Sequence, residues 1–264
     1  MSRNSHAPGV RQSSLMSLHL MGLLIACAFA ATAGAQPKGG RPTSTSTPRT
    51  ATPRPSPTPR CPPPAARKAT RVPEAVAKAE AESLKVRAGE LNDKGEYDAA
   101  ICVVTDAIRL NAQDASAYLI RGDAYSEKHS YDYALKDYTE AIRLDPASAP
   151  AYNNRGLARF NNGRRIHARR RYGEALKEYR EAIKDYTEAI RLDPNYSRAY
   201  NNRGIARFNS GQYSLAVSDY TEAIKLNPQY VNAYFNRAEA YLKLGMRDPA
   251  LADRRKAREL SNPK

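Results

Sequence analysis

Asp137-Tyr-Thr-Glu-Ala-Ile-Arg-Leu-Asp-Pro146 is the most informative stretch of this chain, because it occurs three times. It recurs unchanged at 185–194 and with two conservative changes at 219–228. A second stretch, Ala151-Tyr-Asn-Asn-Arg-Gly-Leu-Ala-Arg-Phe-Asn161, returns at 199–209 with one change. The last two copies of the first stretch begin 34 residues apart. A fixed period of this length indicates a solenoid built from repeated helix pairs.

The same period extends in both directions and divides the C-terminal part of the chain into five repeats. In each repeat, positions four, eight and eleven share one side of a predicted first helix, and small residues at eight, twenty and twenty-seven allow two helices to approach closely. A single pair cannot bury its apolar stripe alone, so the pairs are expected to stack. The repeats span 81–114, 115–148, 149–196, 197–230 and 231–264.

This pattern resembles the tetratricopeptide repeat family over residues 81–264. The residues that match the family are the aromatic at position four, the small residue at position eight and the closing proline. They are Tyr118, Tyr152, Tyr200 and Tyr234; Ala88, Gly122, Gly156, Gly204 and Ala238; and Pro146, Pro194 and Pro228. The resemblance implies an all-α fold, a right-handed superhelical solenoid of antiparallel helix pairs. It also implies a non-catalytic scaffold that binds a protein or peptide segment in its concave groove.

The third repeat departs from the family pattern, because it has 48 residues instead of 34. Half of the excess is a duplicated heptad within 174–191. Seven residues are close to two helical turns, so the second helix is predicted to be two turns longer with its face unchanged. The other half predicts a basic loop. Its arginines are Arg164, Arg165, Arg169, Arg170 and Arg171.

Three asparagines occupy position six of consecutive repeats: Asn154, Asn202 and Asn236. Position six lies about 200° around the helix from the packing residue at position four, so it is expected to face the groove. In the repeat arrays of O-linked N-acetylglucosamine transferases, asparagines at the matching position hold the main chain of an extended peptide. By this resemblance, substitution with Ala should weaken partner binding without lowering thermal stability. The alternative is that the amides only solvate a surface.

Two other sets of side chains belong to the same repeat frame. Phe160 and Phe208, at position twelve, are predicted to supply apolar contacts beside the asparagines. An arginine stands at position seven of every repeat, and an aspartate stands at position twenty-three of four of them. An ion pair between the two helices explains this pattern better than a row of ligand-binding arginines. The residues are Arg87, Arg121, Arg155, Arg203 and Arg237, with Asp137, Asp185, Asp219 and Asp253.

Residues 1–35 have the pattern of a secretory signal peptide: basic residues, an apolar block and a small-residue site that ends at Ala35. Cleavage there leaves Gln36 as the first residue of a secreted or periplasmic chain. An alternative is a bacterial lipoprotein, because the sequence before Cys27 also resembles a lipobox. The apolar block has about 15 residues, which is shorter than the roughly 20 that a membrane span needs.

Residues 36–72 are predicted to be a disordered linker, followed by the repeat domain at 73–264. The linker holds ten prolines and ten serines and threonines with no acidic residue, a composition that favours polyproline II and cannot form a core. Cys61 in the linker and Cys102 in the first repeat do not predict a disulfide framework. Cys61 is interpreted as an unpaired surface thiol or as a residue that pairs between chains, so self-association through Cys61 or through the repeats stays open.

The net charge of +15 is concentrated near the N-terminus. Residues 1–80 hold eleven lysines and arginines against two glutamates, so the repeats themselves carry only +6. Nucleic-acid binding is therefore disfavoured. We find no catalytic constellation, cofactor motif or metal-ligand cluster in the sequence. The alternative to a groove-binding scaffold is an electrostatic anchor, in which the linker and the arginine-rich insertion bind an acidic polymer or a lipid.

Overall fold

The computed structural model describes Cys61 and residues 73–262, which form ten α-helices and no strand. The chain divides into two units, Met1–Arg54 and Pro55–Lys264, and all described residues lie in the second. The helices are α1 (Glu74–Asp93), α2 (Tyr97–Leu110), α3 (Ala115–Glu127), α4 (Tyr131–Leu144), α5 (Ala149–Ala168), α6 (Tyr172–Leu192), α7 (Ser197–Asn209), α8 (Tyr213–Leu226), α9 (Val231–Lys243) and α10 (Arg247–Ser261).

The predicted N-terminal features lie outside this part of the chain. They are the signal peptide, the cleavage site at Ala35 and Gln36, the lipidation candidate Cys27 and, apart from Cys61, the linker. None of the described helices is both long and apolar enough to cross a membrane.

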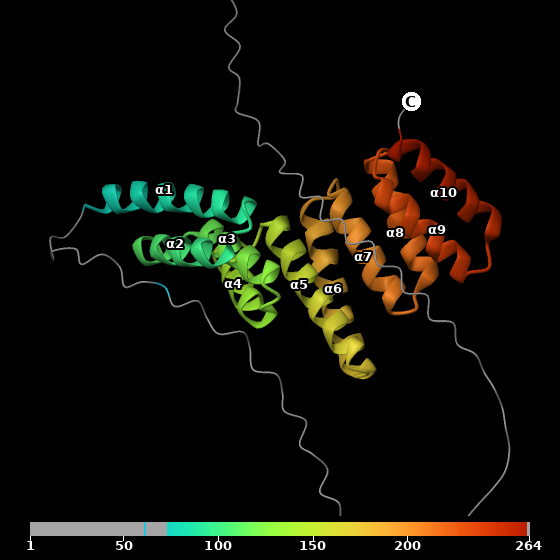
Figure 1. Ribbon diagram of the computed structural model, residues 1–264, viewed down its shortest axis with the longest axis horizontal. Coiled ribbons are helices and arrows are strands. Elements are labelled where there is room, and N and C mark those ends of the chain that lie inside the picture. The colour runs from blue at the N-terminus through green and yellow to red at the C-terminus, as the bar shows by residue number, and fades with distance from the viewer. Residues whose placement is uncertain (1–60, 62–72, 263–264) are drawn as a thin grey trace, which may run out of the picture. The chain divides into compact units, whose positions relative to one another are not determined.

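The helices form five pairs that follow one another along the chain (Figure 1). The two helices of a pair make the largest contacts, and the second helix of each pair packs against the first helix of the next. Consecutive first helices, α1, α3, α5, α7 and α9, also contact one another. They therefore form one continuous face of the stack. The prediction of an all-α solenoid of helix pairs is confirmed.

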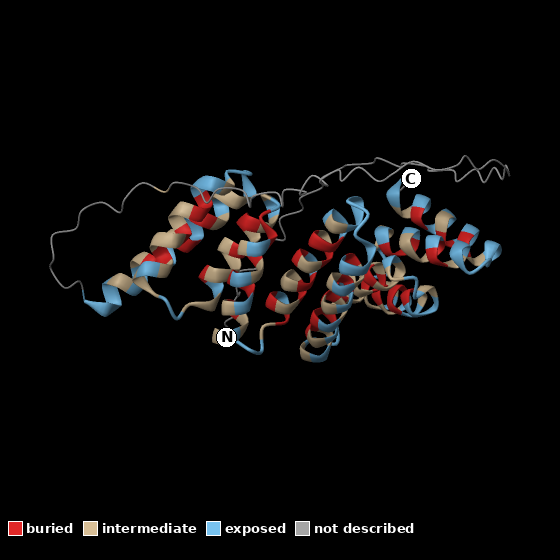
Figure 2. Cartoon of the chain, turned by 90° about the horizontal axis from the view of Figure 1, so that it is seen from below, coloured by how far each residue is buried: buried red, intermediate tan, exposed pale blue. Residues whose placement is uncertain are grey.

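Tyrosine and glycine form the repeated contact inside the middle pairs. Tyr138, Tyr186 and Tyr220 are almost fully buried, and Figure 2 shows buried residues distributed over all pairs. A Cβ atom at Gly122 would lie 2.6 Å from the ring of Tyr138, and a Cβ at Gly204 would lie 2.6 Å from Tyr220. The small residue at position eight is therefore required by the tyrosine ring. In the first repeat the ring is replaced by Val104, and the residue at position eight is alanine.

The insertion in the third repeat lengthens both helices of the pair. Helices α5 and α6 have 20 and 21 residues, against 13 and 14 for α3 and α4. The prediction of a longer second helix is confirmed, whereas the prediction of a basic loop is wrong. Arg164 and Arg165 lie in α5, and only Arg169, Arg170 and Arg171 lie between the helices.

Arg164 and Arg165 are helical because the contact between glycine and tyrosine is repeated one heptad further along both α5 and α6. A Cβ atom at Gly156 would lie 2.8 Å from the ring of Tyr186, and a Cβ at Gly163 would lie 2.7 Å from the ring of Tyr179. The extra seven residues of α5 thus pack on the extra seven residues of α6 as the preceding heptads do. The signal was present in the sequence as Gly163, seven residues after Gly156.

Cys61 and Cys102 form an intramolecular disulfide, with their Cα atoms 5.2 Å apart. The interpretation of Cys61 as an unpaired or intermolecular thiol is therefore corrected. Cys102 is half-buried on α2, where a residue from the preceding linker can meet it. A distance of 41 residues along the chain does not prevent pairing, because only the separation in space limits disulfide formation.

Candidate functional site

The arginine at position seven and the aspartate at position twenty-three form the predicted ion pair in four repeats. The two residues belong to the two helices of one pair, and one arginine Nη atom lies 2.7–2.8 Å from an aspartate oxygen in each case. The pairs are Arg121 with Asp137, Arg155 with Asp185, Arg203 with Asp219, and Arg237 with Asp253. Arg87 has Val103 at the aspartate position and is exposed. The ion-pair prediction is confirmed.

The same arginines also bridge successive repeats. Arg203 Nη1 donates to Thr187 Oγ1 of the preceding pair at 3.2 Å, and Arg237 Nη1 donates to Thr221 Oγ1 at 3.0 Å. Each guanidinium lies over the tyrosine at position four, with its Cζ atom 5.4–5.8 Å from the ring centroid. Four of the five arginines in the row are thus part of the scaffold, because they join the helices of a pair and contact the preceding pair.

The asparagines at position six lie half-buried on the face formed by the first helices, and each donates to the preceding first helix. Asn154 Nδ2 donates to Asp123 Oδ1 at 3.0 Å. The bonds of the other two run from Asn202 Nδ2 to Asn153 Oδ1 at 3.1 Å and from Asn236 Nδ2 to Asn201 Oδ1 at 3.0 Å. Because these amides link adjacent repeats, we now expect alanine substitution to lower stability as well.

The two predicted apolar residues of the groove differ in exposure. The ring of Phe160 is 7% exposed and packs on Tyr179, with centroids 5.3 Å apart. Phe208 is half-buried, and its ring packs against the ring of Tyr213 in a T-shaped arrangement. Five large apolar side chains of first helices leave more than a third of their surface exposed: Val76, Val86, Leu157, Phe235 and Leu242. We call the surface made by Asn154, Asn202, Asn236 and Leu157 the first-helix face.

Asp123 at the N-terminal end of the asparagine row is an unusual carboxyl group. Its Oδ1 accepts from Tyr138 Oη at 2.8 Å and from Asn154. Burial nevertheless raises the pKa of Asp123 from 3.8 to about 6, since removing a carboxylate from water disfavours the charged form.

This raised pKa predicts a pH-dependent contribution to stability. The folded state holds the proton of Asp123 more tightly than the unfolded state, so its contribution is complete below pH 3.8 and is lost as the pH rises towards about 6. Relative to Asp123→Asn, the wild-type chain should lose about 1–3 kcal/mol of unfolding free energy between pH 4 and pH 7. Urea unfolding across this range checks the prediction, and a constant difference between the two proteins would contradict it.

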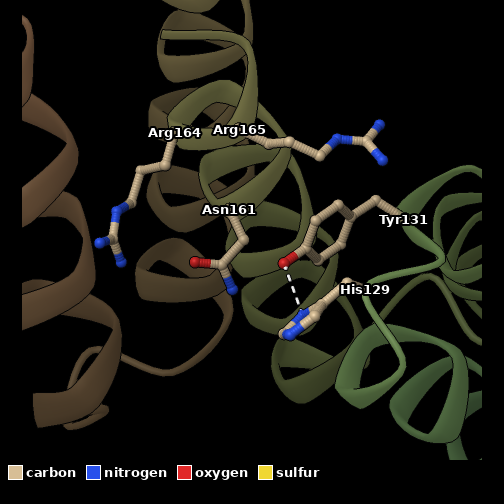
Figure 3. A pocket seen from close by; sticks show the side chains of 5 residues that line it. All are labelled: His129, Tyr131, Asn161, Arg164 and Arg165. Carbon is tan, nitrogen blue, oxygen red and sulfur yellow. Dashed lines mark hydrogen bonds between the residues drawn. The ribbon is translucent and has the colours of Figure 1, made fainter. Parts of the chain in front are cut away.

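A pocket of about 340 Å³ lies where the lengthened α5 passes the turn between α3 and α4 (Figure 3). We call it the arginine pocket. In Figure 3 the ring of His129 and the hydroxyl of Tyr131 point toward one another, with Asn161 beside them. Its lining residues are His129, Tyr131, Asn161, Arg164 and Arg165.

Tyr131 is the buried member of the arginine pocket. Its Oη lies 3.1 Å from His129 Nδ1, and the guanidinium of Arg165 lies over its ring, 5.5 Å from the centroid. Burial raises the pKa of Tyr131, and the charges of Arg165 and Arg164 act against this shift. The phenol is therefore a neutral hydrogen-bond donor at physiological pH.

His129 has a left-handed backbone, with φ of 58°. The equivalent turn residues of three other repeats are Gly95, Gly211 and Gly245, with φ of 77–78°. Arg170 is the equivalent residue of the third repeat, with φ of 60°. A side chain in this region costs roughly 1–2 kcal/mol relative to glycine, and such strained residues gather at functional sites.

The structure divides the five predicted arginines of the insertion into two groups. Arg164 and Arg165 line the arginine pocket, whereas the turn residues Arg169, Arg170 and Arg171 do not. Arg171 Nε donates to Glu174 Oε1 at 2.7 Å. His129 and Tyr131 were not predicted from the sequence; the signal for His129 was its place at a glycine position of the repeat. Within Cys61 and 73–262, no cluster of side chains is suited to a metal ion.

Comparisons with known proteins agree with this arrangement. The family profile described as "TPR repeat" matches residues 122–163, 175–211 and 204–245. A crystal structure of MamA is 25% identical, covers 66% of this chain and 94% of its own, and has a TM-score of 0.56. TTC0263, a thermophilic TPR protein in Thermus thermophilus, is 24% identical over 69% of this chain and 91% of its own, with a TM-score of 0.57.

A third structure is that of YrrB, described as a TPR protein with an unusual peptide-binding site. It is 21% identical, covers 71% of this chain and 92% of its own, and has a TM-score of 0.52. No curated protein matches the sequence. The helix pairs and their face define the chain as an interaction scaffold of the repeat-solenoid class. More specifically, the chain is a tetratricopeptide repeat protein. Proteins of this family typically bind protein or peptide partners and are typically non-catalytic.

Proposed function

We propose that the chain binds an extended segment of another protein along the first-helix face. The observation that carries this proposal is the row of Asn154, Asn202 and Asn236 across three adjacent first helices. An amide offers both a donor and an acceptor, so an evenly spaced row can pair with a peptide backbone whatever its side chains are. The exposed Leu157 beside the row supplies apolar contact.

The bonds to the preceding repeat favour this role. Each asparagine donates one amide N–H to a side chain of the preceding first helix. This bond holds the asparagine side chain in place, so less conformational entropy is lost when a ligand binds. Within the described residues, the carbonyl oxygens of Asn202 and Asn236 accept no hydrogen bond. These oxygens can accept from a peptide N–H, and the second amide proton can donate to a peptide carbonyl. YrrB offers a precedent for peptide binding on this fold.

Alanine substitution of the three asparagines tests the proposal. We expect the triple variant to bind a partner captured from the cell envelope at least tenfold more weakly, because several hydrogen bonds of about 0.5–1.5 kcal/mol are lost. It should also melt earlier, because the inter-repeat bonds are lost. Titration of the partner and thermal unfolding measure the two effects.

A matched control separates binding from stability. Thr187→Ala with Thr221→Ala removes two inter-repeat hydrogen bonds from Arg203 and Arg237, which lie off the first-helix face. This variant should lose a similar amount of thermal stability, and its affinity for the partner should not change. Equal loss of binding in both variants would mean that the asparagines act only through the fold.

We also propose that the chain works outside the cytoplasm. The disulfide between Cys61 and Cys102 supports this, because disulfides persist mainly in oxidising compartments. The sequence pattern of residues 1–35 gives independent support. We expect the exported chain to begin at Gln36, which N-terminal sequencing checks; a lipid-modified Cys27 as first residue would replace secretion by membrane anchoring.

A second candidate function is the electrostatic anchor on an acidic polymer or lipid. It is favoured by four arginines near the end of the α5 and α6 pair that form no ion pair within the described residues. They are Arg164, Arg165, Arg169 and Arg170. Sedimentation with phosphatidylglycerol vesicles tests this function, and it requires that changing all four residues to glutamine abolishes vesicle binding.

A further inference from the structure

We infer that the arginine pocket binds a carboxylate side chain of the protein segment that lies on the first-helix face. This inference rests on the proposed function and deepens it, because it makes the preferred partner an acidic segment. The pocket exists because the third repeat is longer than its neighbours. Helix α5 has seven more residues than α3 and α7, about 10 Å of helix, which has no equally long first helix beside it.

The position of Asn161 connects the pocket with the first-helix face. Asn161 lies seven residues after Asn154, and Arg164 lies seven residues after Leu157. Residues one heptad apart lie on nearly the same side of a helix. The pocket therefore continues the face towards the end of α5, so one extended segment can occupy both.

The charges of the pocket favour an anion. Arg164 and Arg165 form no ion pair among the residues that the structure describes, although Arg165 Nη2 donates to Asn162 Oδ1 at 2.8 Å. Glu127 is the acidic residue whose charge acts on Tyr131, against the two arginines. The two arginines thus outnumber the glutamate at the phenol. Guanidinium groups present planar donors that match a carboxylate.

Neutral donors complete the site. The Asn161 amide and the Tyr131 hydroxyl line the same recess as the arginines. In the tautomer that carries the proton on Nδ1, His129 donates to Tyr131 Oη at 3.1 Å, so the hydroxyl proton is left for the carboxylate. We assign His129 as a positioning residue, which explains why a side chain stands where three other repeats have glycine.

The shape of the site favours a protein segment over a membrane. A recess of about 340 Å³ accommodates a carboxylate side chain and is lined by Arg164 and Arg165 but not by the turn residues Arg169 and Arg170. A carboxylate in the recess therefore requires the first two arginines, whereas a flat bilayer can use all four, which are exposed. Two double variants with the same change in charge distinguish them: Arg164→Gln with Arg165→Gln in the pocket, and Arg169→Gln with Arg170→Gln in the turn.

The experiment uses the chain from Gln36 and two fluorescein-labelled peptides, a fourfold repeat of Gly-Glu-Ser and its counterpart with Gln in place of Glu. We expect the wild type to prefer the Glu peptide by about tenfold in fluorescence anisotropy at low salt. The pocket variant should lose this preference, and the turn variant should keep it. His129→Gly should melt later than the wild type and bind the Glu peptide about threefold more weakly.

Three results would overturn the inference. Equal losses in the pocket and turn variants would mean a general effect of charge. Equal binding of both peptides by the wild type would exclude carboxylate recognition, while capture of a partner by the asparagine row would leave the proposed function intact. Binding of phosphatidylglycerol vesicles that is abolished only in the pocket variant would assign the pocket to lipid.

Discussion

Replacing Gly204 with valine is expected to destabilise the chain by about 3 kcal/mol or more, because the new side chain has no space. A Cβ atom at this position would lie 2.6 Å from Cε1 of Tyr220, a ring that is 1% exposed. The two helices must then separate or the ring must leave the core. Urea unfolding followed by circular dichroism measures the loss.

Two further variants make this result specific. Gly89→Val places the same side chain in another first helix, where no atom lies within 4 Å of the added Cβ, so it should change stability little. Gly204→Ala with Tyr220→Val reproduces the combination of Ala88 and Val104 in the first repeat and should recover most of the stability lost by Gly204→Val. A Gly204→Val protein that unfolds like the wild type would show that the contact with Tyr220 is not required.

Replacing Asp219 with alanine is expected to cost about 3–5 kcal/mol, because it leaves two guanidinium groups without their counter-charge. The Asp219 side chain is 3% exposed and lies 2.8 Å from Arg203 Nη2 and 2.9 Å from Arg207 Nη1. Burial already lowers the pKa of Arg207, which shows that this cation is poorly solvated. Equilibrium unfolding in urea measures the loss, and the partner affinity per folded molecule should not change.

The control is an exposed ion pair of similar geometry. Glu188→Ala removes the partner of Arg191, whose side chain is 66% exposed, and should cost less than about 1 kcal/mol. Replacing Asp219, Arg203 and Arg207 together with apolar residues should restore much of the stability. If Asp219→Ala costs no more than Glu188→Ala, the buried pair does not hold the two helices together.

The contacts within one repeat could be predicted from the residues alone. The helix pairs, the packing at positions four and eight, and the pairing of Arg203 with Asp219 all follow from a period of 34 residues. The physical reason is that helical geometry places residues at fixed spacing on fixed sides, so a repeated sequence repeats its contacts. The longer α6 follows from the same rule.

The contacts between repeats required the structure. Asn202 and Asn236 donate to the preceding first helix, so a neighbouring repeat supplies the acceptor. Phe160 packs on the extra heptad of α6 within its own repeat, a partner that the other repeats lack. The arginine pocket combines a turn from one repeat with a helix from the next, and Cys102 is joined to a residue before the first helix. A repeat period specifies the side of a helix on which a residue lies. Which residues contact that side depends on the lengths of the neighbouring helices, and these are seen only in the tertiary structure.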